Sequence, residues 1–197
     1  MKAAVEKSGP RTVVLSDGEA QLRHMTRGDD AAVLEFARAL PAHDLLFMRR
    51  NIREPKVVEA WAKETAGNKL TTVLAVHEDS IVGCVAIVRD DLSWSPHVGE
   101  LRLVVASQMR GKGLGRALTQ EAIAIALSLG VEKLTALMTV DQHGAIAIFE
   151  GLGFQAEAVL RGHVKDLQGT KHDVVILSLE ITKYLERLQT YGDMASG

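Results

Sequence analysis

The sequence has little that would support a disulfide, a membrane span or a nucleic-acid-binding face. Its 197 residues include one cysteine, Cys84, which excludes an intrachain disulfide and a cysteine metal cluster. The longest uncharged apolar stretch, residues 122–131, is too short to cross a bilayer. Lys and Arg number 23 against 25 Asp and Glu, and neither half of the chain is basic. Binding to nucleic acid or anionic lipid therefore lacks its electrostatic driver, and we expect neither as a partner.

Signals for targeting and for metal binding are also missing. The first ten residues, MKAAVEKSGP, contain no apolar run of signal-peptide length. No pair of histidines has the spacing of a metal site, so we expect no metal. We expect a reduced, cytoplasmic protein with a flexible segment at 1–10, a single domain at 11–180, and a C-terminal helix and tail at 181–197.

Hydrophobic periodicity predicts alternating strands and helices. The expected strands are Thr12–Leu15, Gln21–Met25, Leu70–Val76, Ile81–Val88, Val98–Val105, Lys133–Val140, Gln155–Val164 and His172–Leu179. The first expected helix has Thr26 as its N-cap and ends before Pro41, and the second opens at Pro55. Three further helices are expected at Ala117–Leu129, Gln142–Glu150 and Ile181–Leu188. The order ββααβββαβαββ predicts a mixed α/β sheet.

The strongest chemical signal is the glycine-rich segment 110–116, RGKGLGR, between a buried strand and a long helix. Its three glycines let backbone N–H groups approach a ligand, and the following helix adds free N–H groups and a positive dipole end. Together with Arg110, Lys112 and Arg116, they predict a site for a pyrophosphate. The alternative is a tight strand-to-helix turn that serves packing alone.

Two common phosphate motifs do not fit this segment. No window of the sequence supplies the G-x-x-x-x-G-K-[ST] of a Walker loop. The dinucleotide fingerprint G-x-G-x-x-G fails because Arg116 stands three residues after Gly113, where a glycine is required. The phosphate site is therefore of another kind.

The spacing Arg110-x-x-Gly113-x-Gly115 resembles the coenzyme A loop of the GNAT acetyltransferases. The segment 149–154, FEGLGF, is similar to the "YEKLGF"-type turn of that family, and the order of elements over residues 21–179 also agrees. The resemblance implies a GNAT fold, a mixed and mostly antiparallel sheet flanked by helices, with acetyl-CoA as cosubstrate and no metal.

The resemblance also implies which residues bind the coenzyme. In GNAT proteins the strand before the loop splays from its neighbour, and its backbone pairs with the pantetheine arm. The matching positions are Leu103, Val104 and Val105, whose apolar side chains are equally suited to a core. The expected loop contacts are Arg110, Gly111, Lys112, Gly113, Leu114, Gly115 and Arg116. Gln142 replaces a common asparagine of the family and is expected to hydrogen-bond the cofactor.

Acetylation of an amine needs a neutral nitrogen, so a general base is useful. The predicted base is Glu100, which stands three residues before Leu103, where many GNAT enzymes carry a glutamate. The alternative is an ordinary strand glutamate that pairs with Arg102 or with solvent. The resemblance fails for the general acid, because Phe149 occupies the position of the tyrosine that often protonates the leaving thiolate.

Few side chains could replace that tyrosine. Tyr184 and Tyr191 lie beyond the matched region, and His143, His163 and His172 are best explained as surface residues. Water or the ammonium proton of the substrate is then expected to protonate the thiolate. Cys84, in an apolar strand, is expected to be a buried small hydrophobic residue.

The acceptor amine is left open between two classes. Residues 17–23 and 96–100 show a weaker similarity to the acetyltransferase domains of bacterial protein-lysine acetyltransferases, which favours a protein lysine or N-terminus. A small-molecule amine fits the family equally well. A non-catalytic acyl-CoA-binding module is the alternative to an enzyme, since it would need no tyrosine. A homodimer through the C-terminal strands is an expectation at the level of the family.

Overall fold

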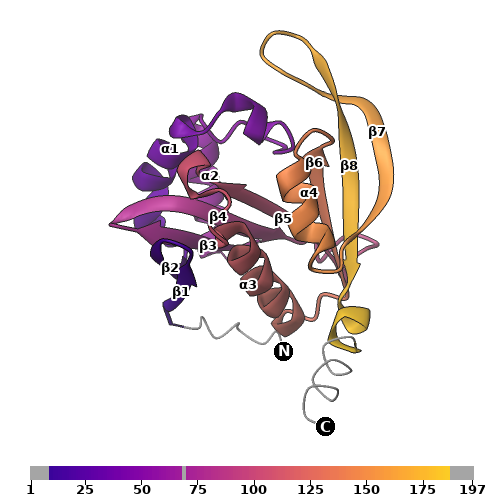
Figure 1. The fold of residues 1–197 in the computed structure, drawn as a ribbon, viewed down its shortest axis with the longest axis horizontal. Helices are drawn as coiled ribbons and strands as arrows, with labels where there is room; N and C mark the ends of the chain where they lie inside the picture. Colours follow the sequence, from indigo (N-terminus) through magenta and orange to yellow (C-terminus); the bar gives the residue numbers. More distant parts are fainter. Residues whose placement is uncertain (1–8, 68–69, 187–197) are drawn as a thin grey trace.

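The computed structural model describes residues 9–67 and 70–186, which form one mixed sheet with helices on both sides (Figure 1). The strands are β1 (Arg11–Leu15), β2 (Gly18–His24), β3 (Leu70–His77), β4 (Ser80–Val88), β5 (Val98–Val105), β6 (Lys133–Thr139), β7 (Gln155–Lys165) and β8 (Lys171–Glu180). The helices are α1 (Asp30–Ala39), α2 (Pro55–Ala66), α3 (Leu114–Ser128) and α4 (His143–Glu150). Short 3-10 turns are η1 (Arg27–Asp29), η2 (Ala42–Leu45) and η3 (Ser107–Met109).

The eight strands lie in the order β1-β2-β3-β4-β5-β6-β8-β7. Every neighbouring pair is antiparallel except β5 and β6, which run parallel. That parallel pairing covers only Val98↔Lys133 to Leu101↔Ala136, although β5 continues to Val105 and β6 to Thr139. The two strands therefore separate beyond Leu101. The expected mixed, mostly antiparallel fold and its element order are confirmed.

Helices cover both faces of the sheet, which explains why β4 is apolar along nearly its whole length. A Cβ atom at Gly83 would lie 3.0 Å from Leu118 of α3, so the side of Gly83 faces α3. Side chains alternate along a strand, so Ala86 of β4 lies on the opposite face of the sheet. There it lines a small pocket together with Trp61 of α2. The core consequently has two layers, one on each side of the central strands.

The first helical segment is held by a capping box. Thr26 donates its backbone N–H (2.7 Å) and its hydroxyl (2.8 Å) to the carboxylate of Asp29, which also pairs with Arg23 at 2.6 Å. The pKa of Asp29 falls to about 2, chiefly because Arg23 donates hydrogen bonds to it. The predicted N-cap at Thr26 is confirmed, and it begins the turn η1 that leads directly into α1.

Several boundaries differ from those expected from the sequence. Helix α3 begins at Leu114, three residues before the predicted Ala117, because Gly113 adopts a positive φ of 93° and serves as its N-cap. Gln142 is the N-cap of α4 and not its first residue. The 3-10 turns were not predicted, since each is a single turn without apolar periodicity.

The predicted terminal segments are only partly covered by the structure. Residues 181–186 are helical, as expected for the closing helix, and positions 187–188 lie outside the described residues. The predicted N-terminal segment is described only from residue 9, and the tail beyond 186, with Tyr191, also lies outside.

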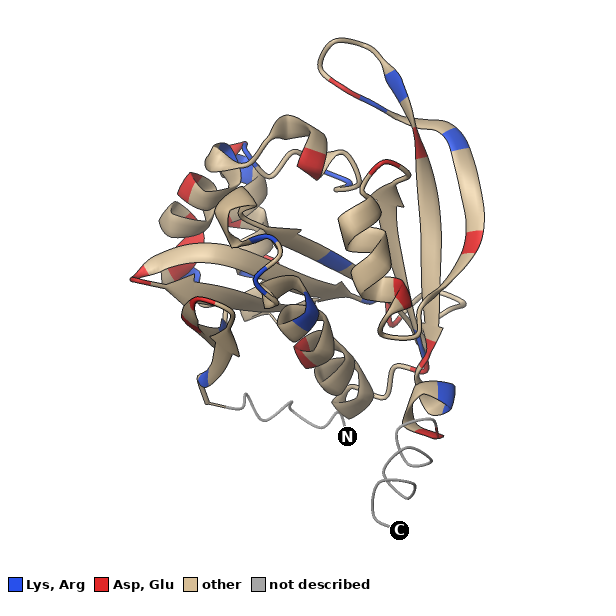
Figure 2. Ribbon diagram, viewed as in Figure 1, with Lys and Arg blue, Asp and Glu red and all other residues tan. Residues whose placement is uncertain are grey.

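Charged residues of both signs are interspersed over the described elements (Figure 2). None of the helices among residues 9–67 and 70–186 is long and apolar enough to span a membrane. The interspersed charges agree with the composition, in which Asp and Glu slightly outnumber Lys and Arg.

Candidate active site

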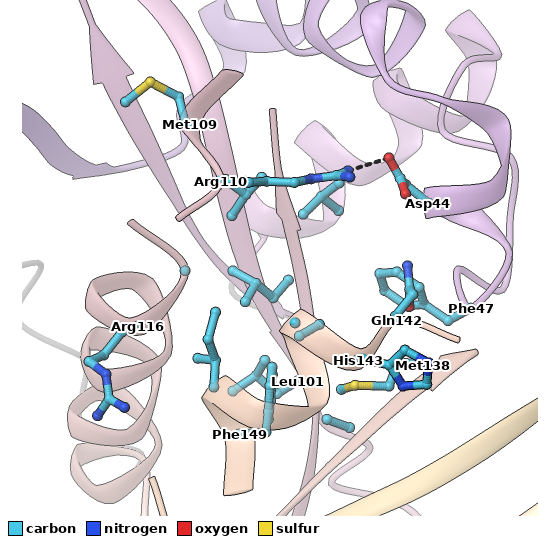
Figure 3. A pocket seen from close by; sticks show the side chains of 18 of the residues that line it. Asp44, Phe47, Leu101, Met109, Arg110, Arg116, Met138, Gln142, His143 and Phe149 are labelled. Carbon is cyan, nitrogen blue, oxygen red and sulfur yellow. Dashed lines mark hydrogen bonds and ion pairs between the residues drawn. The ribbon is translucent and has the colours of Figure 1, made fainter. Parts of the chain in front are cut away.

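A cavity of about 710 Å³ opens where β5 and β6 separate. Leu103, Val104 and Val105 line it from β5, and Leu137 and Met138 line it from β6. Helices α3 and α4 and the η2 turn complete the walls, as the close-up in Figure 3 shows. The parting of two strands thus leaves backbone and apolar side chains facing an open space in the middle of the sheet.

The glycine loop forms one end of this cavity. Gly111 and Gly113 have φ angles of +73° and +93°, which side-chain-bearing residues rarely adopt, and a Cβ at either position would meet nothing within 4 Å. Gly115 is needed for a different reason, because its Cβ would lie 3.2 Å from Ile148 of α4. The loop therefore presents bare backbone and the uncapped N–H groups of the 15-residue helix α3 to the cavity.

The basic side chains of the loop are held by carboxylates of other elements. Arg110 forms an ion pair with Asp44 of η2, drawn as a dashed line in Figure 3. Lys112 pairs with Asp17 of the β1–β2 turn at 2.6 Å. Arg116 lies on α3 beside the end of α4, where a Cβ at Gly151 would come within 2.9 Å of its guanidinium. Arg110 and Lys112 thus each have a carboxylate partner at the loop, whereas no ion pair of Arg116 is found among residues 9–67 and 70–186.

Gln142 has a buried side-chain atom without a hydrogen-bond partner. It is the one such polar atom among the residues that the structure describes. The atom is its Oε1, and the side chain lines the cavity between β6 and α4. A buried, unpaired carbonyl oxygen costs free energy unless a donor reaches it. A ligand in the cavity that offers an N–H or O–H would remove that cost.

Most of the sequence-predicted binding residues meet around this one cavity. Those that line it are Leu103, Val104, Val105, Arg110, Gly111, Gly113, Gly115, Arg116 and Gln142. Lys112 and Leu114 are not among the lining residues, and the Leu114 side chain is fully buried in the core. Leu114 could contact a ligand only through its backbone N–H at the start of α3.

Glu100, the predicted base, does not line the cavity. Its two carboxylate oxygens accept hydrogen bonds from Arg49 (2.9 Å) and Arg102 (2.7 Å), and its side chain is only 14% exposed. Arg102 shares that face of β5 and lies at a second, smaller pocket against α2. The pairing with Arg102 that the sequence offered as the alternative is present, and the role of Glu100 as base stays a prediction.

Phe149 and the tyrosines leave the general acid unassigned. Phe149 lines the cavity, is 2% exposed, and packs edge-to-face on Phe154 with ring centroids 4.8 Å apart. Tyr184 packs against the core from the final helix and is not among the residues around the cavity. Within the described residues, no tyrosine therefore reaches the site.

Of the other candidate side chains, three are histidines and one is the cysteine. His143 lines the cavity, whereas His163 is exposed on β7 and does not. His172 pairs with Asp166 of the β7–β8 loop at 2.8 Å. Cys84 is buried, and burial raises the pKa of its thiol to about 12, so it is an inert core residue, as expected.

The sequence reasoning missed the residues that form the far end of the cavity. His43, Asp44 and Phe47 come from η2 and the residues after it, and Asp141 follows β6. Neither segment carries a repeat, a glycine pattern or a spacing that would have marked it. The two segments are distant in the chain and meet only in the folded protein, where His43 pairs with Asp141.

Comparisons with known proteins agree with this geometry. A family model described as the acetyltransferase (GNAT) family matches residues 36–154. A Bacillus subtilis protein provisionally named phosphinothricin acetyltransferase YwnH is 31% identical over 83 residues, which is 42% of this chain and 50% of that protein. N-acetyltransferase 8F1 of Rattus norvegicus is 33% identical over 79 residues, 39% of this chain and 36% of that protein. The chain thus matches half or less of the length of these relatives.

A solved structure extends the likeness to the whole fold. The Salmonella typhimurium protein yncA, provisionally named an acetyltransferase and determined with its cofactor acetyl-CoA, superposes with a TM-score of 0.69 at 18% identity. The superposition covers 82% of this chain and 94% of that one. At this identity, the likeness is one of fold.

Proposed function

The chain belongs to the acetyltransferase (GNAT) family, and on that premise we propose that it transfers an acetyl group from acetyl-CoA to an amine. The reaction is direct: the amine nitrogen attacks the thioester carbonyl, a C–N bond forms, and the C–S bond breaks. The amine is either on a protein, as a lysine or N-terminus, or on a small molecule.

The observation that carries the proposal is the cavity between the separated strands, closed at one end by the glycine loop. Coenzyme A has a negatively charged pyrophosphate joined to a long arm that contains two amide groups. The bare N–H groups at the start of α3 suit the pyrophosphate, and the free edge of β5 after Leu101 offers partners for amides.

Gln142 provides a separate test of the fit. Its buried Oε1 has no partner within the described structure, and the residue itself lines the cavity. An amide N–H of the coenzyme arm is a donor of the kind that this oxygen lacks. The residues present therefore fit acetyl-CoA, which would supply the activated acetyl group when bound.

The protein's own contribution is then to bind, orient and shield. Arg110 and Arg116 add positive charge next to the phosphate-binding backbone. Leu103, Val105 and Phe149 make the middle of the cavity apolar, which keeps water from the thioester. Water or the ammonium proton of the acceptor protonates the leaving thiolate, because no tyrosine among the described residues reaches the site.

The experiment is a measurement of free thiol release from acetyl-CoA with a panel of amines. The panel contains a lysine peptide, a peptide with a free N-terminus, spermidine and single amino acids. Release that depends on an amine supports the enzyme, and the acceptor that gives the highest rate separates the protein class from the small-molecule class. Tight binding of acetyl-CoA by calorimetry with no release on any amine would instead indicate a non-catalytic acyl-CoA-binding module.

A further inference from the structure

His43 and Asp141 meet at the cavity, where η2 and the turn after β6 form its wall. His43 belongs to η2, and Asp141 follows β6, yet Nε2 of His43 lies 2.8 Å from Oδ2 of Asp141. Both residues line the cavity that also contains Leu103 and Gln142. Their side chains are 37% and 57% exposed, so the pair is open to solvent as well as to the cavity.

This pairing decides which ring nitrogen of His43 is free. The carboxylate of Asp141 accepts from Nε2, and the Thr139 hydroxyl lies 3.5 Å from the same nitrogen. Nδ1 has no hydrogen-bond partner within residues 9–67 and 70–186. In the neutral ring, a hydrogen on Nε2 leaves the lone pair on Nδ1. His43 lines the cavity, and its ring thus keeps one nitrogen free to accept a proton.

Asp141 is suited to hold the ring in that state. Its pKa lies below the ordinary value, first because the side chain of Thr139 hydrogen-bonds to it, and also because of the charge of His43, while burial works in the opposite direction. The carboxylate is therefore ionised at neutral pH. An ionised carboxylate on one ring nitrogen fixes the orientation of an imidazole and stabilises its protonated form.

The charged groups around His43 do not compete for its free nitrogen. The ring of His172, on β8, packs against it edge-on with centroids 5.1 Å apart, and His172 is itself paired with Asp166. Asp44, next in the chain, is engaged by Arg110, and His143 lines the cavity from the start of α4. Glu100 has neither a free acceptor atom nor a place in the cavity lining. Both its carboxylate oxygens accept hydrogen bonds from arginines, and the residue is not among those that line the cavity.

Resting on the proposed function, we propose that His43 is the catalytic residue that takes the proton from the acceptor amine, with Asp141 as its positioning residue. Nδ1 of His43 accepts one proton from the ammonium group R–NH3⁺ and later releases it to solvent. The neutral nitrogen attacks the carbonyl carbon, the C–N bond forms, and the C–S bond breaks with its electron pair on sulfur. The second nitrogen proton goes to the thiolate, directly or through water, which leaves the amide and the free thiol of coenzyme A.

The test is the pH dependence of kcat/KM in the His43→Ala variant of the full chain, with the panel amine that the unmodified protein acetylates fastest. A positioned base contributes on the order of a hundredfold or more, so we expect a loss of about a hundredfold at pH 7. A lysine-type amine has a pKa near 10.4, so its neutral fraction rises roughly three-hundredfold between pH 7 and pH 9.5. The loss should therefore shrink at least tenfold over that interval.

Two further measurements separate a base from a residue that only supports the fold. Free imidazole added to His43→Ala should restore turnover, and acetyl-CoA affinity by calorimetry should stay within about twofold of the unmodified value. His97→Ala is the matched control, because His97 is exposed and lies outside the cavity, and it should keep the unmodified activity and pH profile. Asp141→Asn should lose less activity than His43→Ala, because it keeps the ring and alters only its orientation.

Glu100→Gln provides the rival outcome. If His43 is the base, Glu100→Gln loses activity by the same factor at pH 7 and pH 9.5, and imidazole does not restore it. A loss in Glu100→Gln that shrinks at high pH, together with a pH-independent loss in His43→Ala, overturns the assignment to His43 and leaves acetyl transfer intact. Absence of thiol release by the unmodified protein with every amine overturns the proposed function, and this inference with it.

Discussion

The two ends of the cavity are built in different ways. The glycine loop comes from seven consecutive residues, 110–116, and its shape follows from positive φ angles at Gly111 and Gly113. The far end combines η2 with the turn after β6, and its His43–Asp141 contact joins segments that are distant in the chain. In the function that we propose, one end binds through backbone groups, and the other acts through side chains.

The difference between the two ends shows what pyrophosphate binding and proton removal each require. Binding a pyrophosphate needs a local run of N–H groups, which a short segment can provide by itself. Removing a proton needs a side chain placed relative to the reacting atoms, which only packing of several elements can provide. Four predictions, ordered from the largest expected effect to the smallest, concern the two ends, the helix α4 between them and, for comparison, a residue outside the cavity.

The largest effect is expected at α4, which both ends share. Phe149→Ala removes a ring that is 2% exposed and packed on Phe154, so the free energy of unfolding should fall by about 3–5 kcal/mol in urea. Phe149→Tyr keeps the ring, and we expect its kcat to remain within several-fold of the unmodified value. A large rate gain in Phe149→Tyr at saturating substrate would show that protonation of the thiolate had been limiting.

The second effect concerns Asp29, which lies outside the cavity lining. Asp29→Asn removes a carboxylate whose pKa of about 2 is below its ordinary 3.8. Because the pKa is lowered in the folded state, the stabilisation is present above about 3.8 and is lost as pH falls through about 2. At pH 7 the variant should be less stable by about 2 kcal/mol.

Melting experiments from pH 6 down to pH 2 measure this effect. The stability difference between the unmodified protein and Asp29→Asn should shrink across that acid range, while acetyl-CoA affinity at pH 7 is unchanged. A difference that is constant with pH would show that Asp29 acts through shape alone.

The third effect tests the glycine loop. Gly113→Asp adds a side chain and a negative charge at the start of α3, so acetyl-CoA affinity should fall at least about tenfold by calorimetry. Gly169→Asp is the matched control, because Gly169 has a similar φ of +88° with open space around it, in the β7–β8 loop. Both variants place a side chain at a positive φ in open space, and equal affinities would place the coenzyme elsewhere.

The smallest effect is expected at the contact between the two ends. Asp44→Asn removes the carboxylate that forms an ion pair with Arg110. In the variant, Arg110 can bind phosphate without first breaking that ion pair. The pair is half-exposed at Arg110 and should contribute less than about 1 kcal/mol. Acetyl-CoA affinity should therefore rise, by less than about fivefold. A fall in affinity would mean that Asp44 is needed to place the arginine.

The pattern of the sequence was sufficient for most of the fold. Alternating and 3.6-residue periods located the strands and helices to within a few residues, because each element shows its own buried face. The start of α3 was placed too late because the glycines before it conceal the N-cap at Gly113. The 3-10 turn η2 was missed, although it supplies His43 and Asp44 to the cavity.

What the sequence by itself determined is the local part of the site: the glycine loop, the apolar strand before it and the turn at Phe149. Each depends on conformations and contacts within a few neighbouring residues, so the residue types alone indicate it. The tertiary structure decided where β5 and β6 part, that Glu100 lies between Arg49 and Arg102, and that His43 meets Asp141. These contacts join residues far apart in the chain, and no local energy term selects them before the whole sheet has formed.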